Sequence, residues 1–465
     1  MKMTLRVCLF ACAAVCVSAS ALTLKAGGAA GVANPGARAA ASPTPQSSAT
    51  PQAAATPQRD EKLWRRALAL HKKAVVIDGH NDIPTVMVDE DYDMGVSSVG
   101  KYHTDIARLK QSGMTGEFFS IYVDRQYATP DWVSKNYVRE GGSARRALDL
   151  IDASYRMVEK YPRDLTFATS TADITRAKRE GRVGVLMGIE GGHAIENSLS
   201  ALREFYRLGV RYMTLTHNNT NEWADACCDE AKHNGLSEFG KEVVREMNRL
   251  GMFVDISHVS DKTMSDVLDV SKAPVIASHS SARVFSNHKR NIPDELLKRI
   301  ARNGGVVMVN FYPVFLDEKV RTADIERDAR LKAQRDALRA QFKDDQKRLD
   351  EELKKLNDAN PIPNTTLSVL VDHIDHIAKV AGVDHVGIGS DFDGVPNLPE
   401  GIKDVADLPN ITYELLRRGY GERDVLKILG GNFMRAFAEV ERVARTGRRQ
   451  VSGEGSTRKL GASKN

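Results

Sequence analysis

Cysteine is scarce in this chain of 465 residues, which contains only five. Three of the five, Cys8, Cys12 and Cys16, lie close to the N-terminus, and the other two, Cys227 and Cys228, are adjacent. Adjacent cysteines can form a disulfide only with strained geometry. The sequence therefore excludes a small disulfide-stapled fold and indicates two thiols in a loop.

An excess of one charge and long apolar runs are also lacking. The 66 Lys and Arg residues nearly balance the 61 Asp and Glu residues, and the net charge of +5 is spread along the chain. Because no basic stripe is interleaved with aromatic residues, we expect no nucleic-acid partner. Beyond the N-terminal region, no stretch approaches the about 20 apolar residues of a membrane-spanning helix. We therefore expect no transmembrane segment in the mature chain.

Residues 1–21 have the pattern of a signal peptide. Lys2 and Arg6 precede a short apolar run, and small residues typical of a cleavage site follow it. This pattern predicts a periplasmic or secreted protein. A lipobox, with Cys12 as the lipid-bearing residue, is the alternative interpretation of the same segment.

Composition then divides the rest of the chain. Residues 22–60 are rich in Ala, Pro, Ser and Thr, which predicts a disordered linker, because such a segment buries too little apolar surface to offset the entropy of ordering. Residues 446–465 are rich in Gly, Ser, Lys and Arg and are predicted to be a disordered tail. The folded region is expected at 61–445.

Short apolar runs alternate with amphipathic helical patterns through the folded region. The runs are mostly continuous rather than alternating, as is typical of strands buried on both faces. Eight strands are predicted, at 74–78, 116–123, 183–189, 210–216, 252–257, 275–278, 305–310 and 385–389. Helices are predicted between them at 144–160, 199–207, 237–250, 262–270, 294–303 and 366–380. Eight βα units predict an α/β protein with a (β/α)8 TIM barrel, and a doubly wound open sheet is the alternative fold.

Residues 317–358 interrupt this rhythm. The segment is intensely charged, favours helix and has few apolar residues. It predicts an exposed helical insertion between the seventh and eighth strands, in the form of a helical hairpin. The alternative is an arm for a partner protein or for dimerisation.

Six of the eight predicted strands end in an ionisable or metal-binding side chain. These side chains are His80 and Asp82 after the first strand, Glu190 after the third, His217 after the fourth, His258 after the fifth, His279 after the sixth and Asp391 after the eighth. A single residue of this kind is more often a helix cap or a polar contact. Such residues at the ends of six strands indicate an active site, because TIM barrels build the site at the carboxyl ends of several strands.

Imidazoles and carboxylates without an available thiolate suit a catalytic zinc site. His80 and Asp82 are two residues apart and would face the same side of an extended strand, so together they would bind one ion. His258 and His279 come from neighbouring strands and would hold a second ion, with Glu190 best placed to bridge the pair. Two ions about 3.5–4 Å apart would bind a shared water, lower its pKa and polarise a carbonyl.

Two further roles follow from the same strand ends. Asp391 would carry a proton from the water to the leaving amine. His217 would face the substrate and stabilise the developing oxyanion.

Eight motifs carry these residues in chain order. They are VIDGHNDIP (76–84), GIEGGHAI (188–195), RYMTLTHNNTNEWAD (211–225), VDISHVS (254–260), PVIASHSSAR (274–283), RNIPDELL (290–297), VVMVNFY (306–312) and VGIGSDFDGV (386–395). Over 74–440 the chain closely resembles the membrane dipeptidases of renal dipeptidase type, within the amidohydrolase-like TIM barrels.

The resemblance implies a zinc-dependent dipeptidase with two Zn²⁺ per chain. It implies the same ligands and the same roles for His217 and Asp391 as above, and it adds Arg290 as the residue that binds the carboxylate of the substrate. It also implies small dipeptide substrates, including dipeptides with a D-residue at the second position, and a homodimer. Two alternatives stay open, another amide or lactam hydrolase on the same two-metal site and a non-catalytic secreted binding protein.

Overall fold

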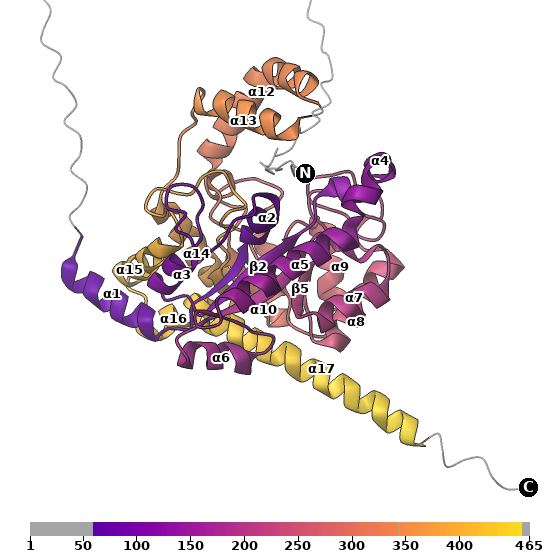
Figure 1. Ribbon diagram of the computed structural model, residues 1–465. Coiled ribbons are helices and arrows are strands. Elements are labelled where there is room, and N and C mark those ends of the chain that lie inside the picture. Colours follow the sequence, from indigo (N-terminus) through magenta and orange to yellow (C-terminus); the bar gives the residue numbers. More distant parts are fainter. Residues whose placement is uncertain (1–58, 344, 458–465) are drawn as a thin grey trace, which may run out of the picture.

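The computed structural model describes residues 59–457 apart from position 344 (Figure 1). The predicted signal peptide, nearly all of the predicted linker and the last residues of the predicted tail lie outside the described residues, and their boundaries stay predictions. In the described part of the chain, no helix is long and apolar enough to cross a membrane.

Nine strands, all paired in parallel, make up the sheet of the described region. They are β1 (Ile77–Asn81), β2 (Gly116–Tyr122), β3 (Leu165–Phe167), β4 (Val183–Glu190), β5 (Val210–Thr214), β6 (Phe253–Asp255), β7 (Ile276–Ala277), β8 (Val306–Val309) and β9 (Val386–Ile388). Strand β2 pairs with both β1 and β4, and β1 pairs with β9, so eight strands close into a ring. The predicted TIM barrel is confirmed, and the open sheet is excluded.

Strand β3 lies outside the ring and pairs only with the start of β4. Sequence patterns did not predict it, because three residues are too few to show a period. The first barrel strand also begins later than predicted, at Ile77 rather than at 74, because the preceding helix runs to Lys73. This shift places His80 inside strand β1.

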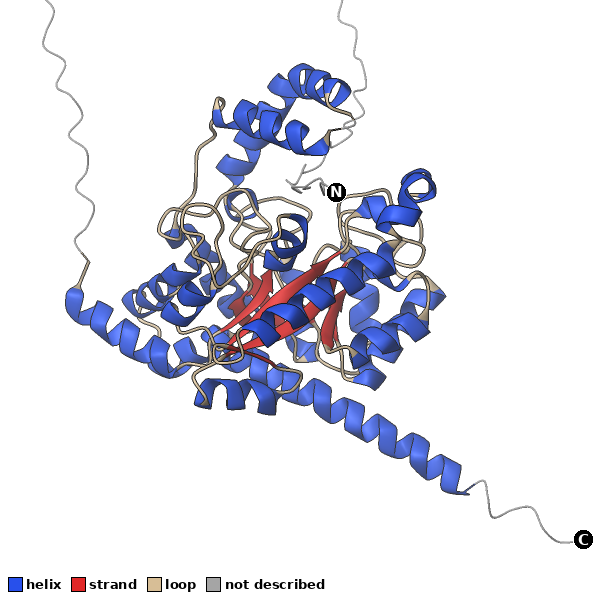
Figure 2. Cartoon of the chain, viewed as in Figure 1, coloured by secondary structure: helices blue, strands red, loops and turns tan. Residues whose placement is uncertain are grey.

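Helices make up most of the remaining chain, and the majority of them surround the ring on the outside (Figure 2). They are α1 (Glu61–Lys73), α2 (Ile83–Asp89), α3 (Ile106–Gln111), α4 (Pro130–Glu140), α5 (Ser143–Lys160), α6 (Thr171–Arg179), α7 (Leu199–Arg207), α8 (Glu238–Leu250), α9 (Asp261–Val270), α10 (Asp294–Asn303), α11 (Pro313–Leu316), α12 (Glu318–Gln341), α13 (Gln346–Asp358), α14 (Leu367–Ala381), α15 (Pro409–Arg417), α16 (Glu422–Leu426) and α17 (Asn432–Thr457). The six predicted helical patterns correspond to α5, α7, α8, α9, α10 and α14. Serine side chains cap α7, α8 and α9 by accepting a backbone hydrogen bond in the first turn.

Helix α17 closes the amino end of the barrel. Asn432, its first residue, donates hydrogen bonds to the carbonyl of Val386, the first residue of β9, and to that of Val383 in the turn before the strand. Phe433 packs against Phe118 with ring centroids 5.5 Å apart, and Phe437 packs against Phe253 at the same separation. The lower barrel is therefore filled by aromatic side chains, which leaves the polar residues to the opposite end. The helix extends to Thr457, beyond the end of the folded region that was expected at 445.

The charged insertion forms the hairpin of α12 and α13, as predicted, between strands β8 and β9. Figure 1 shows it projecting from the end of the barrel toward which the strands point. Its root is fixed to the barrel, because Val320 packs with Tyr312 and Phe315 and the Glu318 amide donates to the carbonyl of Phe285 at 3.0 Å. The hairpin is therefore an appendage on the same side as the strand ends that carry the candidate site.

Candidate metal centre

The six strand ends singled out in the sequence meet at one place. His80 lies in β1, Glu190 is the last residue of β4, and the other five side chains follow the ends of β1, β5, β6, β7 and β9. All seven side chains are buried. The closed barrel therefore brings together every residue that was predicted for the metal site and for proton transfer.

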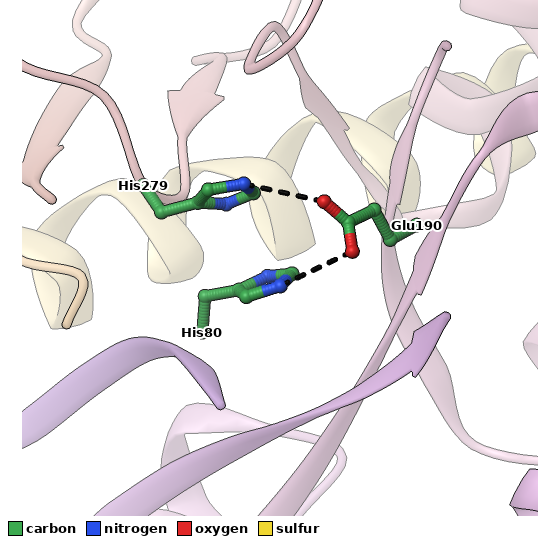
Figure 3. A group of neighbouring side chains, drawn as sticks. All are labelled: His80, Glu190 and His279. Atoms are coloured by element: carbon green, nitrogen blue, oxygen red, sulfur yellow. Dashed lines mark ion pairs between the residues drawn. The ribbon is translucent and has the colours of Figure 1, made fainter. Parts of the chain in front are cut away.

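Glu190 is the centre of the group. Its Oε1 lies 2.9 Å from His258 Nε2 and 3.3 Å from His279 Nε2, and its Oε2 lies 3.4 Å from His80 Nε2. Figure 3 shows the two carboxylate oxygens directed at different histidines, His80 and His279. A carboxylate that presents one oxygen to each side has the arrangement that bridging two cations requires.

The imidazoles on one side of Glu190 are uncharged. Burial lowers the pKa of His258 and of His279 well below the ordinary value, and the charge of Arg290 lowers both further. Their Nε2 atoms are only 3.0 Å apart and both face Glu190 Oε1. Two N–H groups cannot point at each other at this distance, so at least one of the two nitrogens presents a lone pair to its electron-rich neighbours. A divalent cation would satisfy this arrangement.

The other side of Glu190 holds a second set of possible metal ligands. His80 Nε2 lies 3.3 Å from Asp82 Oδ2, and both His80 Nε2 and Asp82 Oδ1 are buried without a hydrogen-bond partner. The ligand atoms of His80, Asp82 and Asp391 all lie within 4.8 Å of one another. Buried polar atoms without a hydrogen-bond partner destabilise a folded protein. A cation bound by these nitrogen and oxygen atoms would satisfy them here as well.

Asp391 differs from the other carboxylates of the site. Burial raises its pKa to about 7, and the nearby charges of Asp82 and Glu190 add to this effect, while His80 opposes it. Asn310 donates a hydrogen bond to Asp391 Oδ2 at 2.7 Å. Asp391 also has a positive φ of 65°, an uncommon conformation for a residue with a side chain. A carboxyl that titrates near neutrality is suited to both accepting and donating a proton.

His217 and Arg290 lie beside the cluster rather than in its centre. His217 Nε2 is 4.0 Å from Glu190 Oε1, and burial lowers the pKa of this imidazole. The Arg290 side chain is only 2% exposed and donates to Ser280 Oγ at 3.1 Å and to the carbonyl of His279 at 3.0 Å. Its Nε has no partner, and none of the described carboxylates forms an ion pair with it.

Several residues that orient the site were missed from the sequence. The Tyr212 hydroxyl lies 2.8 Å from His80 Nδ1, and Asn218 Oδ1 lies 3.0 Å from His258 Nδ1. Gly188 makes room for the Tyr212 ring, since a Cβ at this position would lie 2.0 Å from it. Of the residues that were missed, only Asn310 could have been predicted from the sequence. It directly follows strand β8, just as the predicted site residues follow their own strands.

Two neighbouring polar residues have structural roles. His193 Nε2 lies 2.9 Å from the carbonyl of Val123 and joins two strand ends. Asp393 accepts a hydrogen bond from the His103 amide at 2.6 Å in a turn. Neither belongs to the groups of side chains that surround Glu190.

Comparison with known proteins agrees with this geometry. Residues 64–451 match the model of the family described as membrane dipeptidase, peptidase family M19. The chain is similar to the probable dipeptidase PvdM from Pseudomonas aeruginosa, with 27% identity and a TM-score of 0.70 over 82% of this chain and 99% of that one. It is also similar to a metallopeptidase from Rhodobacter sphaeroides in complex with a phosphinate mimic of the dipeptide L-Ala-D-Ala, with 25% identity and a TM-score of 0.63 over 79% of this chain and 99% of that one.

A third solved structure, dipeptidase AC, is a metallopeptidase of family M19 with 25% identity and a TM-score of 0.63, over 79% of this chain and 98% of that one. The family match covers most of the chain and includes every strand of the barrel. A non-catalytic binding protein is therefore excluded. The chain belongs to the membrane dipeptidase family, peptidase family M19, and is a metallo-dipeptidase.

Proposed function

We propose that the protein is a zinc-dependent dipeptidase that hydrolyses the peptide bond of small dipeptides, including those with a D-residue at the C-terminal position. The observation that carries the proposal is the buried guanidinium of Arg290, which has no carboxylate partner among the described residues and lies beside a cluster of metal-ligand side chains. A buried charge of this kind is costly unless it is paired. The free carboxylate of a dipeptide would supply the ion-pair partner that Arg290 lacks.

Five residues would hold two Zn²⁺ ions. His80 and Asp82 would bind the first ion, His258 and His279 would bind the second, and Glu190 would bridge the two. When bound, the ions supply Lewis-acid chemistry, which lowers the pKa of water and polarises the substrate carbonyl. The neutral state of His258 and His279 supports this assignment, because only a neutral imidazole offers a lone pair to a metal.

The remaining residues would act on the substrate. Arg290 would bind the C-terminal carboxylate with its planar fork and thereby fix the peptide bond against the cluster. His217 would donate a hydrogen bond to the oxygen that becomes negatively charged. Asp391, with its pKa near 7, would accept the proton of the attacking water and return it to the leaving amine.

The test combines metal analysis with a substrate panel. Purified protein is assayed for zinc and for hydrolysis of L-Xaa-L-Xaa and L-Xaa-D-Xaa dipeptides, with N- and C-blocked versions and a chelator as controls. The proposal predicts about two zinc ions per chain and chelator-sensitive cleavage of the free dipeptides, with the blocked versions resistant. Two zinc ions without dipeptide cleavage would indicate that the substrate is another amide or a lactam. A folded protein without bound metal would contradict the proposed metal site.

Location and assembly belong to the same proposal. The signal-peptide pattern at 1–21 supports export to the periplasm or the medium, with lipid attachment at Cys12 as the alternative. The family resemblance supports a homodimer. Mass spectrometry of the mature N-terminus and analytical ultracentrifugation test the two proposals separately.

A further inference from the structure

Asp255 is a buried carboxylate beneath the candidate metal centre. It is the last residue of strand β6 and is fully buried, and none of the described Lys, Arg or His side chains forms an ion pair with it. Its carboxylate accepts four hydrogen bonds instead. Oδ1 accepts from the amides of Ser257 at 3.0 Å and Ser278 at 2.9 Å, and Oδ2 accepts from the hydroxyls of Thr214 at 2.5 Å and Ser278 at 2.6 Å.

Ser278 connects this carboxylate to a candidate metal ligand. Its Oγ lies 2.8 Å from Nδ1 of His279, the ring nitrogen that faces away from Glu190. A serine hydroxyl has one proton, and an ionised carboxylate can only accept. Because Ser278 donates its proton to Asp255, it can only accept from His279, so the imidazole must carry its hydrogen on Nδ1. The lone pair of His279 is then on Nε2, directed at the centre of the site.

The other two histidines proposed as metal ligands have neutral partners at Nδ1. His80 Nδ1 contacts the hydroxyl of Tyr212, and His258 Nδ1 contacts the side-chain oxygen of Asn218. Among the three, only His279 has an Nδ1 that is linked to a carboxylate, through the hydroxyl of Ser278. Hydrogen bonding of a metal-bound imidazole to an anion fixes its tautomer and raises its basicity as a ligand.

We propose that Asp255 is a positioning residue for the second metal-binding site, acting through Ser278 to hold His279 in the tautomer that binds the metal. The inference rests on the proposed function and deepens it, because it assigns a role to a residue that touches neither metal nor substrate. It also explains why a carboxylate without an ion-pair partner among the described side chains is kept at this depth in the barrel.

The Asp255→Asn variant gives a sharp test, because the structure dictates how the amide must lie. Its oxygen must take the place of Oδ1, which accepts from two backbone amides, so its NH2 group faces the hydroxyls of Thr214 and Ser278. The amide would then donate to Ser278, which would turn its own proton toward His279 Nδ1. The hydrogen of His279 would move to Nε2 and block the metal.

The measurement is the dissociation constant of the zinc site beside His258 and His279, by competition of the full chain with a chromogenic chelator, with anomalous diffraction at the zinc edge identifying which of the two sites is emptied. Asp255→Asn is expected to weaken this site by about 10- to 100-fold, as outer-shell partners of metal ligands typically do. Ser278→Ala is expected to weaken it less. In the Ser278→Ala background, Asp255→Asn should change zinc affinity by no more than about twofold, because the hydroxyl that links residue 255 to His279 is gone.

Thr214→Val is the matched control. It removes another hydroxyl from the same carboxylate oxygen but makes no contact with His279, so metal affinity should stay within about twofold of the parent. Parental affinity in Asp255→Asn, or an equal loss in both backgrounds, would overturn the inference while leaving the two-zinc site intact. A parent protein that binds no zinc would instead contradict the proposed function.

Discussion

Arg290 is held in position before any substrate arrives. Its guanidinium is fixed by Ser280 and by the carbonyl of His279, and it lies over the ring of Phe315 at 5.4 Å. Its position beside His217 and His258 is visible in the pKa of both imidazoles, which its charge lowers. The structure thus supplies a rigid cation where one end of a dipeptide would lie.

Replacing Arg290 by methionine should therefore weaken substrate binding. Loss of a charged hydrogen-bonded pair costs about 1.5–3 kcal/mol, which corresponds to a fall of about 10- to 150-fold in kcat/KM for a free dipeptide. The measurement is steady-state kinetics with the free dipeptide and its C-terminal amide. The variant should treat the two substrates almost alike, and an unchanged preference for the free carboxylate would remove Arg290 from the binding site.

Asp391 is expected to control the rate rather than the metal content. Asparagine preserves the shape of the side chain but cannot carry the proton, so Asp391→Asn should lower kcat by about 10²- to 10⁴-fold, the usual contribution of general acid–base catalysis. Zinc content and kcat should be measured on the same sample. Near-normal turnover with full metal loading would contradict the role of this residue.

At the scale of the elements, the α12–α13 hairpin is attached to the barrel through its root. Val320 packs at this root, and Asp317 accepts a hydrogen bond from Thr365 where the chain returns, at 3.3 Å. The two ends of the insertion therefore lie close together. A short linker would be able to replace it.

Deletion of residues 323–359, with a Gly/Ser linker in their place, should leave the barrel folded and its zinc content unchanged. The kcat/KM for dipeptides is expected to stay within about threefold of the parent, since changes in the hairpin should have little effect on a metal centre that its described residues do not contact. Thermal unfolding, metal analysis and the substrate panel check the three expectations. Loss of zinc from the shortened protein would show that the hairpin is part of the site.

The sequence predicted all eight strands of the ring, because continuous apolar runs mark strands buried on both faces. It also predicted the group around Glu190, because the carboxyl ends of barrel strands converge on one place whatever the loops do. Tyr212 and Asp255 were not predicted, since their roles depend on which face of a strand points inward and on contacts between distant strands. Arg290 was found only through the family resemblance, because no strand ends there.

At the scale of the whole molecule, several histidines are buried in a neutral state. Burial lowers the pKa of His71, His193 and His373 to about 4. His373 accepts from the amide of Ala282 through Nδ1 and donates through Nε2 to the carbonyl of Leu316, which needs one specific neutral tautomer. Protonation would break this connection between the β7 loop and helix α11.

The free energy of unfolding should therefore fall as the pH falls. The unfolded chain binds the proton near pH 6.5 and the folded chain only near pH 4, so stability is complete above about 6.5 and is lost between these values, by up to about 3 kcal/mol per histidine. Urea unfolding of the parent and of His373→Gln at pH 7 and at pH 5 measures the effect. The variant should be less stable at pH 7 but less sensitive to pH, and equal pH dependence in both proteins would contradict the account.

Glu190 is proposed to bridge two metal ions at the carboxyl end of the barrel. Crystals of the zinc-loaded protein, with anomalous diffraction measured at the zinc edge, test this claim most directly. Two anomalous peaks are expected, one beside His80 and Asp82 and the other beside His258 and His279, with an oxygen of Glu190 directed at each. A single peak, or two peaks away from Glu190, would contradict it.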